Sequence, residues 1–283
     1  MGLLDFFKDK GFKASGDRVQ LGDGSQWEVL LDVENVERTV EDNASLIVVH
    51  SSADTAKMHF DVCQRASLRL IEVFTGDCFS ECDIHQQADS VCDITCVSVA
   101  GSVADYTIDL DGQHASNRLR SAYIAGGEER TKVSLRVNHN VSDCTSDSLV
   151  KGVAGGKAVG EFYGLVYVAQ DAQRTDARQT NRNIEIGSEA KIITKPQLEI
   201  YADDVKCSHG ATVGQLDGEA VMYMRQRGLS EQQARRLQIE GFVNDIVLAA
   251  GEIGECLAEE ILSSHSYSHS YLELTSEFYY FLA

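Results

Sequence analysis

The chain has very little proline, a shortage of positive charge and no long hydrophobic run. Its 283 residues include one proline, Pro196, and 25 Lys+Arg against 44 Asp+Glu, for a formal net charge of −19. A field of this sign repels nucleic-acid backbones and anionic lipid surfaces, so neither is expected as a partner. No stretch approaches the length of uninterrupted apolar residues that a membrane-spanning helix needs, so no membrane span is predicted.

The N-terminal residues also lack the features of a targeting signal. They show no basic start, apolar core and small-residue cleavage site, and Phe6 stands where a myristoylation signal needs Ser or Thr. We therefore expect a cytoplasmic protein whose eight cysteines are reduced thiols.

Many short strands are predicted from about residue 26 to about residue 205, with little helical periodicity. They are marked by alternating or β-branched apolar residues next to Gly, Asn, Asp or Ser, at 27–31, 45–49, 67–73, 94–99, 106–110, 131–137, 162–168, 183–186, 191–193 and 198–201. A barrel, a sandwich or a parallel β-helix would each fit this pattern. The pattern alone does not choose between them.

The hydrophobic period changes to a helical one from Asp217. Apolar residues then recur at helical spacing, with Ser230 as a predicted N-cap and Gly251 and Gly254 as interruptions. We expect an N-terminal lead-in at 1–25, a β core at 26–216, a helical C-terminal domain at 217–263 and a peripheral tail of low complexity at 264–283.

The candidate site with the most chemical content is Cys207 and His209. Alternate residues of a strand share one face, so the thiol and the imidazole would lie side by side, as suits a soft metal. A Gly-Ala-Thr segment follows, and we interpret it as a small-residue turn that leaves room for close approach. The competing interpretation is a buried thiol beside a hydrogen-bonded histidine. Two ligands leave a metal open, so a second chain or a second turn would have to complete the site.

A second cysteine-rich segment contains Cys78, Cys82, His85, Cys92 and Cys96. Zinc knuckles usually carry Cys-x2-Cys turns, which this segment lacks. Four-residue spacing on a strand puts Cys92 and Cys96 on one face, as for thiols packed in a β core. We interpret the segment as core, because free cysteine behaves as a small hydrophobe.

The segment Gly152-Val-Ala-Gly-Gly-Lys-Ala158 is similar to a phosphate-binding loop but fails its requirements. Only three residues separate Gly152 from Gly156, and Ala158 replaces the hydroxyl that would hold Mg²⁺. We interpret it as a turn between strands and expect no bound nucleotide and no ATP hydrolysis by this chain.

The remaining polar groups form no catalytic set. His139 is interpreted as a surface residue rather than a second ligand, and the acidic pairs Glu128-Glu129 and Glu259-Glu260 as solvated faces. Neither a Gly-x-Ser-x-Gly elbow nor a His-Glu-x-x-His motif occurs. The sequence therefore predicts a protein that is not an enzyme.

Three segments resemble the SufB/SufD family of iron–sulfur cluster assembly proteins. They are Thr-Lys-Pro-Gln-Leu-Glu-Ile-Tyr-Ala-Asp-Asp-Val-Lys-Cys-Ser-His-Gly-Ala-Thr from residue 194, Gly-Leu-Val-Tyr-Val-Ala-Gln-Asp-Ala-Gln-Arg-Thr-Asp-Ala-Arg-Gln-Thr-Asn-Arg-Asn at 164–183, and Met-Tyr-Met-Arg-Gln-Arg-Gly at 222–228. Cys-Ser-His is more like the SufD branch, because the SufB branch usually has Cys-Glu-His.

The resemblance implies a right-handed parallel β-helix followed by a small C-terminal helical domain. It also implies a scaffold subunit that forms a heterodimer with SufB and binds the ATPase SufC through residues from 218 to about 262. In that family ATP-driven closure of SufC rearranges the SufB–SufD interface, where a transient Fe–S cluster forms. By position His209 resembles a cluster ligand shared with SufB, and Cys207 the neighbouring thiol with a less defined role.

Two features depart from the family, and two other functions stay open. Family members usually begin with a helical domain, whereas strand-like sequence starts here within the first thirty residues, which indicates a short form or a fragment. The tail after Ser263 resembles nothing in the family. The other functions are a homodimeric metal-binding module, in which two Cys207/His209 pairs face each other, and a β-helix carbohydrate-active enzyme.

Overall fold

The computed structural model describes residues 10–20, 26–52 and 54–255, which form two sheets and a short helical part. In the described residues the strands are β1 Arg18–Gln20, β2 Gln26–Leu31, β3 Asn35–Val40, β4 Ser45–Ser51, β5 Thr55–Val62, β6 Ser67–Phe74, β7 Cys78–Gln86, β8 Val91–Ser98, β9 Ser102–Leu110, β10 Ser116–Ala125, β11 Arg130–His139, β12 Thr145–Gly155, β13 Val159–Val168, β14 Asp176–Ile186, β15 Lys191–Ile200 and β16 Lys206–Gly214. Two helices follow, α2 Gly218–Arg225 and α3 Glu231–Ala249.

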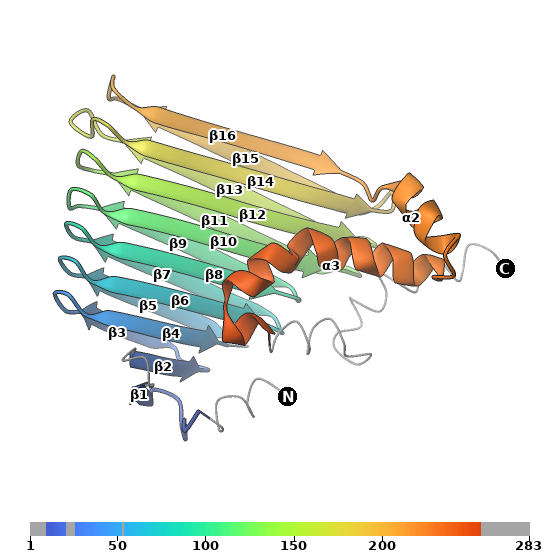
Figure 1. Ribbon diagram of the computed structural model, residues 1–283, viewed down its shortest axis with the longest axis horizontal. Helices are drawn as coiled ribbons and strands as arrows, with labels where there is room; N and C mark the ends of the chain where they lie inside the picture. Colours follow the sequence, from blue (N-terminus) through green and yellow to red (C-terminus); the bar gives the residue numbers. More distant parts are fainter. Residues whose placement is uncertain (1–9, 21–25, 53, 256–283) are drawn as a thin grey trace.

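From β2 onward, consecutive strands alternate between the two sheets, so the chain winds as a coil (Figure 1). One sheet has the order β1-β2-β4-β6-β8-β10-β12-β14-β16, and the other has β15-β13-β11-β9-β7-β5-β3. Apart from the antiparallel β1–β2 pair, each strand pairs in parallel with the strand one turn later. This arrangement is a mainly β, parallel β-helix core with a short helical end, as predicted. The right-handed winding stays a prediction from the resemblance.

The turns lengthen along the coil. Gln26 lies beside Leu46, whereas Val159 lies beside Lys191, so the repeat grows from 20 to 32 residues. One corner of each turn carries a residue with positive φ, and these residues stack: Asn43, Arg65, Asp89, His114, Asp143 and Arg174, with φ between 57° and 66°. Asn and Asp adopt this conformation more readily than most residues, which accounts for polar residues at these corners.

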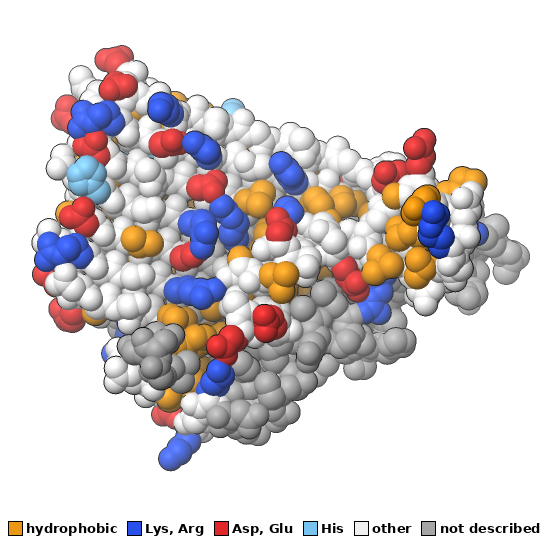
Figure 2. Space-filling view, viewed as in Figure 1, with side chains coloured by type: hydrophobic (Ala, Val, Ile, Leu, Met, Phe, Trp, Pro, Cys, Tyr) orange, Lys and Arg blue, Asp and Glu red, His pale blue; other side chains and the backbone are white. Residues whose placement is uncertain are grey.

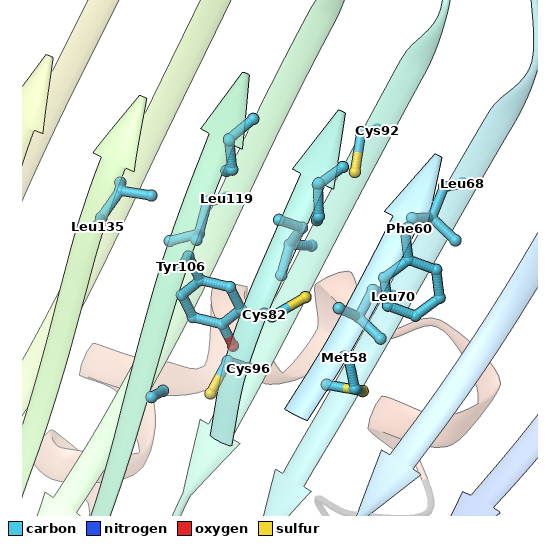
Figure 3. Close-up of a cluster of buried hydrophobic side chains, with 14 of the residues drawn as sticks. Met58, Phe60, Leu68, Leu70, Cys82, Cys92, Cys96, Tyr106, Leu119 and Leu135 are labelled. Carbon is cyan, nitrogen blue, oxygen red and sulfur yellow. The ribbon is translucent and has the colours of Figure 1, made fainter. Parts of the chain in front are cut away.

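The interior of the coil is a stack of apolar side chains (Figure 3). Phe60, Leu70, Ile94 and Tyr106 are fully buried there, because every second residue of each strand points inward. In β9 buried and half-buried residues alternate along the whole strand. This period-two pattern is the signal from which strands were predicted.

The outer face of the larger sheet is covered in part by α3, which lies across the even-numbered strands in Figure 1. The last five residues of β6, Leu70–Phe74, are therefore all buried, although their side chains alternate between the two faces. Ile239 and Ile246 of α3 pack against this face, and the Lys151 ammonium lies 2.8 Å from the Asp245 carboxylate. Ser230 caps α3 as predicted: its hydroxyl accepts the Gln233 backbone N–H.

The sequence identified many of the strands but not where each of them begins and ends. The two runs predicted at 191–193 and 198–201 belong to one strand, β15, while β1, β10 and β12 were not identified, nor were β3, β5 and β7. Their exposed faces carry many charged residues, such as Glu37, Lys57 and Glu81. Residues 256–283, with the end of the expected helical domain and the tail, lie outside the described residues, as do 1–9 and 21–25 of the expected lead-in.

A polar cluster around Glu72 interrupts the apolar interior. The Glu72 carboxylate is fully buried, accepts hydrogen bonds from the hydroxyls of Ser80 (2.9 Å) and Tyr106, and lies 2.8 Å from Nδ1 of His50. These three partners are also buried. A buried carboxylate is tolerated only when it is paired in this way.

Replacing Glu72 by Ala should therefore destabilise the fold strongly. The change leaves three buried polar side chains without their common partner, so urea unfolding should show a loss of about 3–5 kcal/mol. Glu37→Ala, which removes an exposed carboxylate from β3, should change the unfolding free energy by less than about 0.5 kcal/mol. Equal losses in the two variants would contradict this account of the cluster.

Candidate functional site

The coil ends at β15 and β16, each of which has only one neighbour in its sheet. β16 pairs with β14 alone and β15 with β13 alone, so each has a free backbone edge within the described part of the chain (Figure 1, top). Both strands are mostly exposed, unlike the strands beneath them. The interior of the coil is therefore open at this end.

Cys207 and His209 lie on β16 and point to the same face. They are in register with Ala177 and Gln179 of β14, whose side chains are buried in the interior, so both face inward at the open end. Cys207 is half-buried against an apolar cluster that includes Val166, whereas His209 is exposed. The sequence thus predicted this juxtaposition, but not its position at the end of the coil.

Partial burial alters the acidity of the Cys207 thiol. Loss of solvent raises its pKa above the usual range, with a smaller raising effect from Asp176, and a backbone hydrogen bond from Ala177 opposes the shift. The thiol is therefore protonated at neutral pH until a cation binds. Since the thiolate is the metal ligand, binding at Cys207 must release a proton.

The segment after His209 differs from its predicted turn. Gly210, Ala211 and Thr212 continue β16 as regular strand, paired with Thr180, Asn181 and Arg182 of β14. A side chain placed at Gly210 or Gly214 would contact nothing within 4 Å. Contacts inside this chain therefore do not require glycine at either position.

The other cysteine-rich segment is core, as predicted. Cys78, Cys82, Cys92 and Cys96 are buried on β7 and β8, and burial raises the pKa of each thiol, to about 12 for Cys96. His85 lies apart on the outer face, with Nδ1 3.2 Å from the Asp111 carboxylate. Residues 10–20, 26–52 and 54–255 contain no cluster of three His, Cys, Asp or Glu side chains suited to a metal.

The glycine-rich segment after residue 151 is a strand rather than the predicted turn over most of its length. Gly152 to Gly155 belong to β12, and the turn is confined to Gly156 and Lys157. A Cβ at Gly152 would lie 2.2 Å from the Tyr123 ring, so this glycine makes room for a buried aromatic side chain. Close packing, and not phosphate binding, explains it.

His139 was expected at the surface but is fully buried at the end of β11. Its Nε2 is 2.8 Å from the Ser146 hydroxyl, and its Nδ1 has no partner. Burial lowers its pKa from 6.5 to about 4, so the ring is neutral at physiological pH. The polar sequence Asn-His-Asn hid this burial, which only the alternation along β11 could have indicated.

Beyond the coil, α2 exposes apolar side chains. Met222 and Tyr223 are 61% and 55% exposed, and hydrophobic atoms gather over α2 in Figure 2. A groove between α2 and α3 is lined by Met222, Arg225, Leu229 and Glu231 among others. Among the described helices none is long and apolar enough to cross a bilayer.

Comparison with known proteins identifies the family. The model of the SUF system FeS cluster assembly SufBD core domain matches residues 16–242, which include the coil, α2 and most of α3. The chain belongs to the SufBD family. This confirms the resemblance on which the fold was predicted.

Three relatives show how much of the length of other family members this chain covers. The iron–sulfur cluster assembly protein SufD of Escherichia coli is 40% identical over 54% of this chain and 36% of its own length. A SufBD family protein of Synechocystis is 36% identical over 53% of this chain and 34% of its own length, and one of Mycobacterium leprae 27% identical over 77% and 60%. The chain thus spans between about a third and three fifths of these relatives.

The lowered pKa of His139 should make the fold sensitive to mild acid. The histidine pKa is 6.5 in the unfolded chain and about 4 in the folded one, so between these pH values only the unfolded chain takes up the proton. Stability therefore decreases as the pH is lowered from 6.5 to about 4. Unfolding free energies at pH 7 and 4.5 should differ by about 2–3 kcal/mol more in the wild type than in His139→Gln. Parallel pH profiles for the two proteins would contradict this.

Proposed function

We propose that this chain is the SufD-type scaffold subunit of an iron–sulfur cluster assembly complex, without catalytic activity of its own. It pairs with SufB, and a transient Fe–S cluster forms at their interface between SufB groups and His209, with Cys207 beside it. The cluster is the cargo of the complex, and this chain binds no nucleotide. The observation that carries the proposal is the placement of Cys207 and His209 on a strand with a free backbone edge.

The composition of the two end strands favours β16 as the pairing edge. Proteins usually protect a free edge with proline or charged side chains. β15 is protected in this way, since it carries Pro196, Lys191 and Lys195. β16 has one charged residue, Lys206, and two glycines, Gly210 and Gly214. A Cβ added at either glycine would have no atom within 4 Å. A strand of a partner could add here by backbone hydrogen bonds.

The chemistry of the two side chains suits the cargo. Thiolate and imidazole both ligate iron in iron–sulfur centres. Two ligands from one chain are too few for a closed site, so the partner must supply the others, and an incomplete set allows later release. The protonated Cys207 thiol makes its participation dependent on pH, whereas exposed His209 is accessible to a ligand at once.

The helical part is proposed to bind SufC. Its exposed apolar side chains, Met222 and Tyr223, border the groove between α2 and α3, and isolated monomers seldom expose such pairs without a partner. Nucleotide-driven movement of two SufC subunits would then reach the end of the coil through α2, because only residues 215–217 separate α2 from β16.

His209→Ala should lower cluster formation without breaking the complex. The variant, co-expressed with SufB and SufC, removes one ligand, and we expect at least about tenfold less Fe–S absorbance after anaerobic reconstitution. Ser208→Ala changes the adjacent side chain on the opposite face and should behave as the wild type. A wild-type cluster yield from His209→Ala, with an intact complex, would refute the assignment.

Exchanging Met222 and Tyr223 for Ser should weaken SufC binding. Loss of two apolar contacts in an interface centre should cost about 2 kcal/mol or more, equivalent to roughly thirtyfold in affinity. Val91→Ser serves as the control, because Val91 is 48% exposed on β8 away from the helices. The binding is measured by calorimetry with purified SufC, and unchanged affinity in the double variant would place the SufC surface elsewhere.

A homodimer through the same edge is the second candidate, since a free edge strand can also pair with its own copy. The mass of the pure chain, alone and with SufB, separates the two assemblies. A dimer that SufB does not displace would favour the homodimeric metal-binding module.

A further inference from the structure

Gln179 on β14 has an unusual environment for a buried amide. Its side chain is 1% exposed, yet neither Oε1 nor Nε2 has a hydrogen-bond partner among the described residues. Leaving such groups unpaired in an interior costs about 1–3 kcal/mol. Native proteins carry few such groups, and each needs an explanation.

The neighbouring amides show that the interior can satisfy such groups. Asn181 and Asn183 point inward from the same strand and are equally buried. The Asn181 amide donates to the carbonyl of Val150 (3.1 Å), and Asn183 donates to the carbonyl of Thr212 (3.1 Å) and accepts from the Tyr123 hydroxyl (3.2 Å). Gln179, two residues earlier, is the exception.

The structure also leaves space for the Gln179 amide. It lies over Gly164 of β13, where a Cβ would be 2.5 Å from Oε1 and 2.6 Å from Nε2. Any other residue at position 164 would displace the amide. An unpaired amide with a glycine beneath it is an arrangement that packing alone does not explain.

Gln179 is also the residue in register with His209. Adjacent strands are about 4.8 Å apart, so a glutamine and a histidine at paired positions on one face are within hydrogen-bonding reach of each other. A metal-bound histidine almost always donates its second ring N–H to an acceptor that fixes its orientation. No hydrogen bond of the His209 ring is found among the described residues, and Gln179, its register partner on the adjacent strand, has an unused acceptor oxygen.

We propose that Gln179 is the positioning residue of His209: its Oε1 accepts the second ring N–H of His209 when the ring binds iron. The inference rests on the proposed function, because it assumes that His209 is a metal ligand. The stability lost in the free chain is then recovered when the site is loaded.

Metal titration of the full chain tests the inference. Under anaerobic conditions Co²⁺ serves as the probe, since thiolate–Co²⁺ absorption reports binding at Cys207. We expect Gln179→Leu to weaken Co²⁺ binding by about 10–100-fold. Gln179→Glu retains an acceptor oxygen and should restore affinity to within about threefold of the wild type, since carboxylates are common acceptors for metal-bound histidine. Gln197→Leu, an exposed glutamine of β15, is the control and should have no effect.

Two further measurements separate positioning from a structural role. Urea unfolding of the metal-free chain should show Gln179→Leu to be as stable as the wild type or more stable, because the change removes two unpaired polar atoms. In the Zn²⁺-loaded protein, ¹⁵N-histidine NMR should show a protected ring N–H of His209 in the wild type and Gln179→Glu but not in Gln179→Leu.

The outcomes distinguish a failure of the inference alone from a failure of the proposed function. Binding that requires His209 but is unchanged in Gln179→Leu overturns the inference and leaves the proposed site intact. Absence of binding overturns the inference, and binding that His209→Ala leaves unaffected overturns the proposed site as well. If Gln179→Leu destabilises the metal-free chain and Gln179→Glu fails to restore affinity, an ordered water satisfies the amide and the inference is wrong.

Discussion

The parallel backbone ladder between successive turns is the interaction on which the structure depends. Each strand from β4 to β14 satisfies its N–H and C=O groups on the strands one turn before and one turn after it, so the coil propagates without a hairpin. Such a ladder cannot satisfy its own last strand. The free edge of β16 therefore follows from the architecture, and the chain places its thiol and imidazole at this edge.

The interior changes in character along the same direction. The first turns are filled mainly by Leu, Ile, Val and Phe side chains, and buried polar groups there, such as Glu72, are paired. On β14 the inward residues are Gln179, Asn181 and Asn183. Apolar side chains dominate the interior of the earlier turns, while amides accumulate beneath the open end. Polar groups there are compatible with a polar ligand and a removable partner, because neither leaves a large apolar surface exposed when it departs.

The sequence predicted the strands with clear apolar alternation, the burial of Cys92 and Cys96 and the cap at Ser230, because each depends on a local pattern. It did not identify β1, β3, β5, β7, β10 or β12, and charged outward residues mask the alternation in β3, β5 and β7. It also failed for Gly152, where a glycine that accommodates Tyr123 was taken for a turn. His139 was misplaced for a similar reason: two asparagines beside it suggested solvent, although the ring points into the coil. The candidate site was found from sequence since Cys207 and His209 are two residues apart.

The sequence by itself determined that this is a mainly β, acidic protein of the SufBD family with a Cys-Ser-His motif on a strand. Only the tertiary structure decided that this strand is the edge of the coil and that His209 is in register with the unpaired amide of Gln179. It also decided that the other free edge is β15, whose proline and lysines disfavour pairing with a further strand. The reason is that these relations join residues about one turn apart, and the turns vary from 20 to 32 residues. Local periodicity fixes which face a side chain occupies, but the register between turns is set by corner geometry and packing along the whole coil.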